Sequence, residues 1–164
     1  MTSARAPLRI LFVCTGNICR SPAAENLFRE HARRAGILPE LEIDSAGTGD
    51  WHAGEDPDPR SADALREAGY PAVGIARGVL PGDFVRQDLL VCMDRSHVDD
   101  LLARGAPAER VVLIRHFDAA RDHDDVPDPY HGGREGFTSM IAMLEAAMDG
   151  LMARVRDELA RRRA

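Results

Sequence analysis

The sequence predicts one α/β domain, in which a parallel sheet lies between two layers of helices, and three observations support this fold class. Apolar runs of strand length alternate with amphipathic helical segments. The chain has 164 residues, of which 45% are hydrophobic and 29% charged, enough for one core. No repeat or low-complexity stretch divides it. We therefore expect residues 1–164 to form a single domain that binds its ligand at the carboxyl ends of the strands.

Four segments have the patterns of strands. Residues 8–14 (LRILFVC) form a continuous apolar run that is typical of a strand buried on both faces. Residues 41–46 alternate in polarity, and shorter apolar strands are expected at 88–92 and 110–114.

Four segments have the patterns of helices. The first is expected to begin after an N-cap at Ser21, and others are expected at 60–68, opened by Asp58 and Pro59, and at 96–104. A long C-terminal helix contains Gly150, which costs about 1 kcal/mol relative to alanine. Its apolar face is formed by Phe137, Ile141, Leu144, Met148, Leu151, Val155 and Leu159.

The charge and composition exclude several classes of partner. With 21 basic and 27 acidic residues the net charge is −6, so binding of a nucleic acid through a general basic field is not expected. No apolar run approaches the roughly 20 residues that cross a bilayer, and the N-terminal apolar stretch is too short for a signal peptide. We expect a cytoplasmic chain with no membrane partner and a monomer by default. Three cysteines, an odd number, do not indicate a disulfide framework.

The loop between the first strand and the first helix carries the chemistry. Cys14 ends the strand and Arg20 stands where the helix begins. Backbone N–H groups at such a position bind anions, helped by the helix dipole. A cysteine there, beside an arginine, is stabilised as a thiolate, and Arg20 offers a planar fork of donors. Gly16 and Asn17 are residue types that tolerate a positive φ. The sequence therefore predicts a loop that binds phosphate and directs a thiolate at it.

The alternative for Cys14 is a side chain that fills the end of a buried strand, but Arg20 would then have no evident anion partner. About 0.4 Cys-x5-Arg matches are expected by chance in this composition, and about 0.02 when Ser or Thr must follow. Cys92 lies in an apolar strand with no arginine beside it, and for this residue we favour the core interpretation.

Residues 14–21 (CTGNICRS), followed by Pro-Ala-Ala-Glu at 22–25, resemble the signature of the low-molecular-weight protein tyrosine phosphatases. Residues 128–130 (Asp-Pro-Tyr) resemble the acid motif of that family, and residues 45–48 and Trp51 resemble its bacterial members. The similarity extends over essentially the whole chain. It implies the Rossmann-like phosphotyrosine phosphatase I fold with a four-stranded parallel sheet. It also implies no metal or organic cofactor, a phosphotyrosine-containing protein as partner, and a two-step reaction through a phosphocysteine.

The resemblance also implies the roles of individual residues. Cys14 would be the nucleophile, and Arg20 would bind the phosphate and the transition state. Asp128 would protonate the departing phenolate and then take a proton from the water that hydrolyses the phosphocysteine. The phosphate-binding loop would comprise Thr15, Gly16, Asn17, Ile18, Cys19, Arg20 and Ser21.

Further residues would support that chemistry. The Ser21 hydroxyl would bond to the thiolate, and Asn17 would hold the loop through a polar network that includes Ser45. Cys19 could form a reversible disulfide with Cys14 that protects the nucleophile from oxidation. The walls of the substrate site would be Trp51, Tyr130 and His131.

The sequence departs from the family pattern at two positions. Many relatives have a histidine where Gly74 stands, and that histidine supports the loop, so support here must come from Ser45, from water or from another side chain. Many relatives also have a second aromatic residue where this chain has His131, which makes the entrance less apolar. We expect His131 to be an exposed rim residue rather than a catalyst. Without the resemblance, Asp128 could be an ordinary turn aspartate.

Other functions are weighed on particular residues. Arsenate reductases of this fold need two further cysteines, and only Cys92 lies beyond the loop. Protein arginine phosphatases carry threonine at the position of Ile18, whose apolar side chain suits an aromatic ring. A non-catalytic phosphate-binding module would not need the nucleophile, the arginine and the acid together. The His and Asp residues of 116–125 have no recurrent ligand spacing, and a solvated acidic loop is favoured there over a metal site.

Overall fold

The protein is described here by a computed structural model that covers residues 4–164. Within these residues it has four β-strands and five α-helices, joined by loops and short 3₁₀ turns. The strands are β1 (Leu8–Cys14), β2 (Leu41–Gly47), β3 (Leu89–Cys92) and β4 (Val111–Leu113). The helices are α1 (Arg20–Arg34), α2 (Pro59–Glu67), α3 (Pro81–Arg86), α4 (Arg95–Ala103) and α5 (Arg134–Arg163), and the 3₁₀ turns are η1 (Leu38–Glu40), η2 (Ala108–Arg110) and η3 (Ile114–Phe117).

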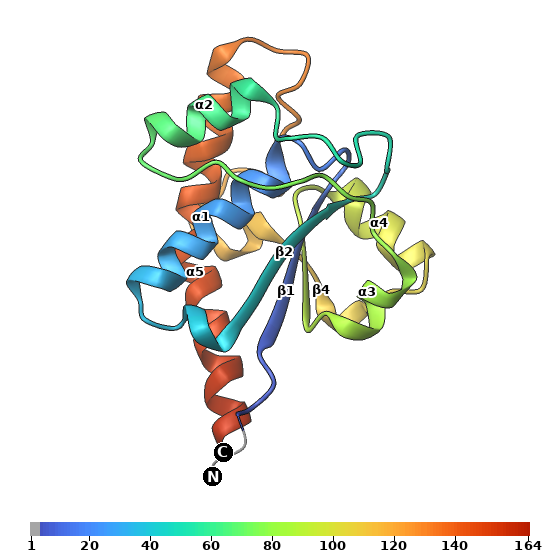
Figure 1. Cartoon of the computed structure of the whole chain (residues 1–164), viewed down its shortest axis with the longest axis vertical. Coiled ribbons are helices and arrows are strands. Elements are labelled where there is room, and N and C mark those ends of the chain that lie inside the picture. The colour runs from blue at the N-terminus through green and yellow to red at the C-terminus, as the bar shows by residue number, and fades with distance from the viewer. Residues whose placement is uncertain (1–3) are drawn as a thin grey trace.

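The strands form one parallel sheet in the order β2-β1-β3-β4. Leu8 pairs with Leu41 on one side of β1, and Ile10 pairs with Leu89 on the other. Helices α1, α2 and α5 lie on one side of the sheet, and α3 and α4 lie on the other (Figure 1). The predicted three-layer α/β fold with a four-stranded parallel sheet is therefore confirmed.

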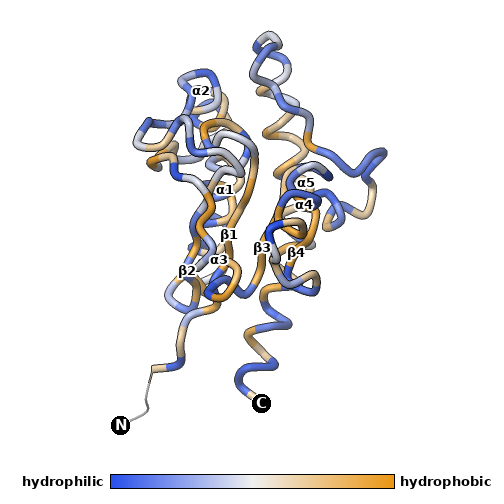
Figure 2. Tube along the Cα trace, turned by 90° about the vertical axis from the view of Figure 1, so that its right-hand side faces the viewer, coloured by the Kyte–Doolittle hydropathy of each residue, from blue (hydrophilic) through white to orange (hydrophobic). Residues whose placement is uncertain are grey.

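The central strand β1 is buried on both faces because its side chains alternate between two apolar clusters. Ile10 and Phe12 belong to the cluster that includes the residues of α1 and α5. Leu11 and Val13 belong to the smaller cluster that includes residues of α3 and α4. The apolar character of the central strands and the alternation of apolar and polar residues along α5 are visible in the hydropathy colours of Figure 2.

The sequence placed the start of the first helix incorrectly. It named Ser21 as the N-cap, whereas α1 begins at Arg20 after Cys19, which makes no side-chain capping bond. The Ser21 side chain instead lies next to Cys14 and Asn17. Serine is a common N-cap residue, but the Ser21 hydroxyl makes buried polar contacts instead of capping the helix. The prediction from the capping pattern was therefore wrong.

Helix α3 was not predicted. It spans only Pro81–Arg86, and Asp83 and Phe84 are its buried residues. Such a segment is too short for a periodic pattern to stand out.

No helix among residues 4–164 has both the length and the apolar character needed to cross a membrane.

Gly150 is required because α5 lies very close to the backbone of η3 at this residue. From the sequence, we expected this glycine only to lower the helix propensity. A Cβ atom at this position of α5 would lie 2.1 Å from the backbone oxygen of Phe117 in η3. The backbone of η3 therefore leaves no room at position 150 of α5 for even a methyl group. The glycine therefore allows α5 to pack directly against η3.

We expect Gly150→Ala to lower the free energy of unfolding by about 1–3 kcal/mol, because overpacking against Phe117 outweighs the higher helix propensity of alanine. Urea denaturation followed by circular dichroism would measure the change. Gly82→Ala in α3 is the matched control, since no described atom outside its own helical turn lies within 4 Å of its Cβ position and its stability should stay the same or rise. A Gly150→Ala protein as stable as the wild type would contradict the steric argument.

Candidate active site

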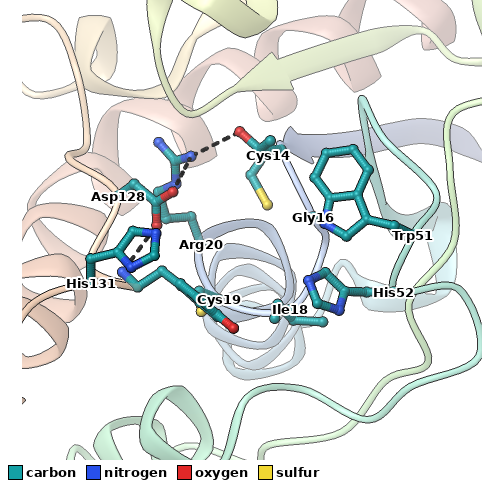
Figure 3. A pocket seen from close by; sticks show the side chains of 11 residues that line it. Cys14, Gly16, Ile18, Cys19, Arg20, Trp51, His52, Asp128 and His131 are labelled. Carbon is teal, nitrogen blue, oxygen red and sulfur yellow. Dashed lines mark hydrogen bonds and ion pairs between the residues drawn. The ribbon is translucent and has the colours of Figure 1, made fainter.

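The site lies where the carboxyl ends of the parallel strands meet. Strand β1 ends at Cys14 and its neighbour β2 at Gly47, and a cavity of about 400 Å³ lies between the loops that follow these two strands and the segment before α5. In Figure 3 the Cys14 sulfur points into this cavity, with Trp51 and His52 on one side and Asp128 and His131 on the other. The cavity is lined by Cys14, Thr15, Gly16, Ile18, Cys19, Arg20, Trp51, His52, Asp128, Tyr130 and His131.

Other segments bind several carbonyl groups in and next to the loop between β1 and α1, whereas the N–H groups of this loop have no partner among the described residues. The carbonyl oxygens of Cys14 and Thr15 accept from Thr48 and Gly49, and that of Ile18 accepts from Asp58. Within the described part of the chain, no backbone N–H of residues 15–19 donates a hydrogen bond to the protein. Unpaired N–H groups before the N-terminus of α1 form a site for an anion.

Asn17 holds the loop in this conformation. Its φ of 58° is the only positive value at a non-glycine residue among residues 4–164. The side-chain amide donates to Ser21 Oγ at 2.7 Å and to Ser45 Oγ at 2.9 Å, and its oxygen accepts from the backbone N–H of Arg77 at 3.0 Å. Thus Ser45 and the Arg77 backbone support the loop in this chain, in which glycine occupies position 74.

Ser21 links this network to the sulfur. Its hydroxyl oxygen lies 3.0 Å from Cys14 Sγ. Because the oxygen already accepts from Asn17, the hydroxyl proton is available to donate to the sulfur, and a thiolate can only accept. Neither Asn17 nor Ser21 lines the cavity, and both side chains are buried behind it.

Arg20 is buried and held on one edge of its guanidinium group. Nη1 donates to Asp94 Oδ2 at 2.6 Å and to the Val126 carbonyl at 3.0 Å. Burial acts against ionisation of Asp94, but bonds from Ser96 and Arg20 keep the pKa of this carboxyl below its usual range. Arg20 is therefore paired with a carboxylate while it faces the cavity.

Asp128 lies at the cavity wall on a loop that precedes α5. Its side chain is 52% exposed, and Oδ2 is 3.8 Å from Arg20 Nη2. Its Oδ1 accepts from the backbone N–H of Tyr130 at 3.1 Å, a turn contact that leaves Oδ2 directed at the cavity. Arg60 of α2 donates to the Tyr130 carbonyl at 3.0 Å, and its guanidinium lies 5.3 Å from the Tyr130 ring.

Aromatic and imidazole rings form the mouth of the cavity. Trp51 is 65% exposed, and Tyr130 and His131 contact each other edge to face with centroids 4.9 Å apart. His52 lies beside Trp51 at the mouth and pairs with Glu55. The sequence did not indicate His52, because a histidine in a loop rich in Gly, Asp and Pro has no pattern of its own.

The three cysteines differ in environment, and all three are free thiols. Burial, together with the nearby Asp58 carboxylate, raises the pKa of Cys19 to about 12. Burial in the sheet raises the pKa of Cys92 well above its usual range, as expected for a core residue. Cys14 differs from both because its sulfur lies at the floor of the cavity, 3.0 Å from the Ser21 hydroxyl oxygen.

Sequence reasoning missed Asp94 and His97. Asp94 follows β3, and the carboxyl ends of parallel strands meet at one edge of the sheet, so its position after a predicted strand was the signal that could have found it. It also caps α4 by accepting from Ser96 N at 2.8 Å. His97 is buried, and its ring lies 2.8 Å from the Thr15 hydroxyl.

Several aspartates of the acidic stretch 116–125 form ion pairs with nearby basic side chains. Asp118 and Asp122 pair with Arg115, and Asp124 pairs with His116 and Arg121. Among residues 4–164, no three His, Cys, Asp or Glu side chains are placed together as metal ligands.

A cysteine at the floor of an amide-lined anion site, with a buried arginine beside it, is the arrangement of a cysteine-dependent phosphatase. Residues 9–161 match the family described as low molecular weight phosphotyrosine protein phosphatase, and the chain belongs to this family. The resemblance drawn from the sequence is thereby confirmed.

Particular relatives are similar over almost their full length. A low molecular weight protein-tyrosine-phosphatase of Streptomyces coelicolor is 48% identical over 157 residues, which cover 92% of this chain and 95% of the relative. Low molecular weight protein-tyrosine phosphatase A of Mycobacterium tuberculosis is 43% identical, covering 94% and 96%. A protein tyrosine phosphatase of Entamoeba histolytica, solved with Hepes in its active site, superposes with a TM-score of 0.88 at 34% identity, covering 92% and 98%.

The left-handed backbone at Asn17 gives a test of how the loop is held. We expect Asn17→Ala and Asn17→Gly both to be less stable than the wild type, since each leaves buried partners unsatisfied at a cost of about 1–3 kcal/mol. Alanine should be the worse by about 0.5–1 kcal/mol, because only glycine adopts this φ without strain. Chemical denaturation would measure both differences. Equal stability of the two variants would show that backbone strain at residue 17 is negligible.

Proposed function

We propose that this chain, as one domain, hydrolyses phosphotyrosine in proteins, and aryl phosphates generally, through a phosphocysteine formed on Cys14. The observation that carries the proposal is the Cys14 sulfur at the floor of a cavity whose loop N–H groups have no partner among residues 4–164. A phosphate placed there would meet donors on its equatorial oxygens and the sulfur in line with its ester bond. The established family membership supports the same conclusion.

In the first step the Cys14 thiolate attacks phosphorus, an S–P bond forms, and the bond from phosphorus to the tyrosyl oxygen breaks. Arg20 and the loop N–H groups of residues 15–20 stabilise charge on the three equatorial oxygens. A phenolate is a poor leaving group at neutral pH, so Asp128 donates a proton to it as the bond breaks. The position of Asp128 at the cavity wall supports this role.

In the second step water attacks the phosphocysteine on the face that the phenol has left. Asp128, now a carboxylate, takes a proton from the water, and the S–P bond breaks to release inorganic phosphate and the Cys14 thiolate. The Ser21 hydroxyl donates to the sulfur as its charge returns, which its distance of 3.0 Å from Sγ supports. Each step is a displacement at phosphorus and needs no change of oxidation state.

The shape of the cavity favours an aryl ester. The sulfur is almost completely buried, so the phosphorus must be carried on a long, narrow side chain to reach it. Trp51 and Tyr130 at the mouth offer faces for a phenyl ring. The Ile18 side chain adds an apolar wall on the same side as Cys19, where a polar group would suit a phosphoguanidinium better. Phosphotyrosine fits these features better than phosphoserine or phosphoarginine does.

We expect the wild type to hydrolyse p-nitrophenyl phosphate and a phosphotyrosine peptide without added metal, and Cys14→Ser to lose this turnover while it still binds the peptide. The serine hydroxyl is far less nucleophilic than a thiolate but leaves the N–H groups in place. Release of phosphate from matched phosphotyrosine, phosphoserine and phosphoarginine peptides would be measured for both proteins. Full turnover by Cys14→Ser would refute the assignment of Cys14 as the nucleophile. A preference of the wild type for phosphoarginine would refute the proposed substrate class.

We expect Asp128→Asn to lower kcat about 10²- to 10⁴-fold for phenyl phosphate, whose leaving group needs a proton. The loss should be much smaller for p-nitrophenyl phosphate in the phosphorylation step, because nitrophenolate leaves without protonation. Pre-steady-state release of phenol and nitrophenol would separate this step from hydrolysis of the phosphocysteine. An equal loss in the phosphorylation rate for both esters would rule out Asp128 as the acid.

A further inference from the structure

The Thr15 hydroxyl lies between a buried histidine and the phosphate-binding arginine. Its Oγ1 is 2.8 Å from His97 Nε2 and 3.2 Å from Arg20 Nη2. Thr15 is in the loop, His97 is in the first turn of α4, and Arg20 opens α1, so three separate elements meet at this oxygen. The chemistry proposed above uses the backbone of Thr15 and makes no use of its hydroxyl or of His97.

The direction of the hydrogen bonds follows from the backbone of Asp94. The Asp94 N–H donates to His97 Nδ1 at 3.1 Å, a shorter contact than the 3.3 Å between Asp94 Oδ1 and the same nitrogen, so we infer that Nδ1 is the acceptor and is unprotonated. In a neutral imidazole the proton must then be on Nε2, which donates to Thr15 Oγ1. Burial lowers the pKa of His97 to about 4, with the Arg20 charge acting in the same direction and the Asp94 carboxylate opposing it. The ring is therefore a neutral donor at physiological pH.

The donors of Arg20 can be accounted for one by one. Both hydrogens of Nη1 are taken, by Asp94 and by the Val126 carbonyl. One hydrogen of Nη2 is directed at Thr15 Oγ1. Within the described residues the Nε hydrogen and the second Nη2 hydrogen have no hydrogen-bonded acceptor, although Asp128 Oδ2 lies 3.8 Å from Nη2. These are the donors that remain for the oxygens of a phosphate.

The geometry points to Thr15 and His97 as positioning residues that fix the plane of the Arg20 guanidinium, with His97 orienting the Thr15 oxygen and that oxygen holding Nη2. This inference deepens the proposed function and rests on it. Asp94 and Val126 hold only Nη1, so they leave the group able to tilt about that edge. A contact on Nη2 removes the tilt and directs the free donors at the cavity.

The role follows from the need for alignment in phosphoryl transfer. In the transition state charge spreads over the equatorial oxygens, and Arg20 is useful only if its fork matches their positions. A guanidinium that tilts still binds a tetrahedral phosphate, but it loses part of its preference for the trigonal arrangement. Loss of the Thr15 contact should therefore weaken binding of vanadate, which mimics the trigonal transition state, more than binding of the product, inorganic phosphate.

Two matched pairs of variants test this. Thr15→Val removes the oxygen with little change of shape, and Thr15→Ser keeps it. His97→Asn keeps an acceptor for the Asp94 N–H but cannot reach Thr15, whereas His97→Gln places an amide donor near the position of Nε2. For each variant we would measure kcat and KM on p-nitrophenyl phosphate, inhibition by vanadate and by inorganic phosphate, and the urea midpoint. Quenching of Trp51, the single tryptophan, by phosphate gives affinity independently of turnover.

We expect Thr15→Val and His97→Asn each to lower kcat about tenfold and to lower the affinity for vanadate by about the same factor. The KM and the affinity for inorganic phosphate should change less than threefold. Thr15→Ser and His97→Gln should recover most of the loss. The double variant Thr15→Val/His97→Asn should be no worse than the worse single variant, since both act through one oxygen.

Any one of the following results would overturn the inference: unchanged vanadate affinity in Thr15→Val, a loss in Thr15→Ser as large as in Thr15→Val, or losses that multiply in the double variant. A uniform loss of vanadate and phosphate binding with a lower urea midpoint would also overturn it, because it indicates only a weakened fold. Failure of the proposed function is distinct, since the wild type itself would then lack turnover or phosphate binding.

Discussion

The structure of the site depends on three hydrogen bonds made by one buried amide. The Asn17 side chain joins the loop to Ser21, to β2 through Ser45 and to the backbone at Arg77. These bonds hold residue 17 in a left-handed conformation and thereby fix the path of the loop whose N–H groups are unpaired among the described residues. The same network gives Ser21 an oxygen that already accepts, so that its proton is free for sulfur. If this amide were lost, the anion site and the environment of the nucleophile would change together.

The parallel sheet determines where the remaining groups come from. Because the carboxyl ends of β1, β2 and β3 lie side by side, the loop, Ser45 and Asp94 reach one place from distant parts of the sequence. Glycine at position 47 allows the end of β2 to lie against the loop, since a Cβ there would lie 2.6 Å from the carbonyl oxygen of Thr15. Asp128 arrives from the opposite side, on the segment before α5, with Arg60 holding its neighbour Tyr130.

Much of this arrangement was predictable from sequence, for identifiable reasons. The strand at 8–14 and the helix face built on Phe137 and Leu159 are long periodic patterns, and the loop after Cys14 combines residue types that have a shared chemical purpose. Contacts between distant segments were not predictable. Asp94 and His97 each have an ordinary local role at the start of α4, and only the pairing of β3 with β1 brings them to Arg20. Likewise, nothing in the local sequence shows that Gly150 faces the backbone of Phe117.

The contrast among the cysteines has a practical consequence for labelling the protein. Cys92 is enclosed in the sheet, and both it and Cys19 are held as neutral thiols by burial, so alkylating agents that require a thiolate will react with them slowly. Cys14, by contrast, points into the cavity that we propose as the phosphate site. Iodoacetate, which carries its own carboxylate, should therefore attach a single carboxymethyl group to the chain, and competition by phosphate would then report occupancy of the site by mass spectrometry.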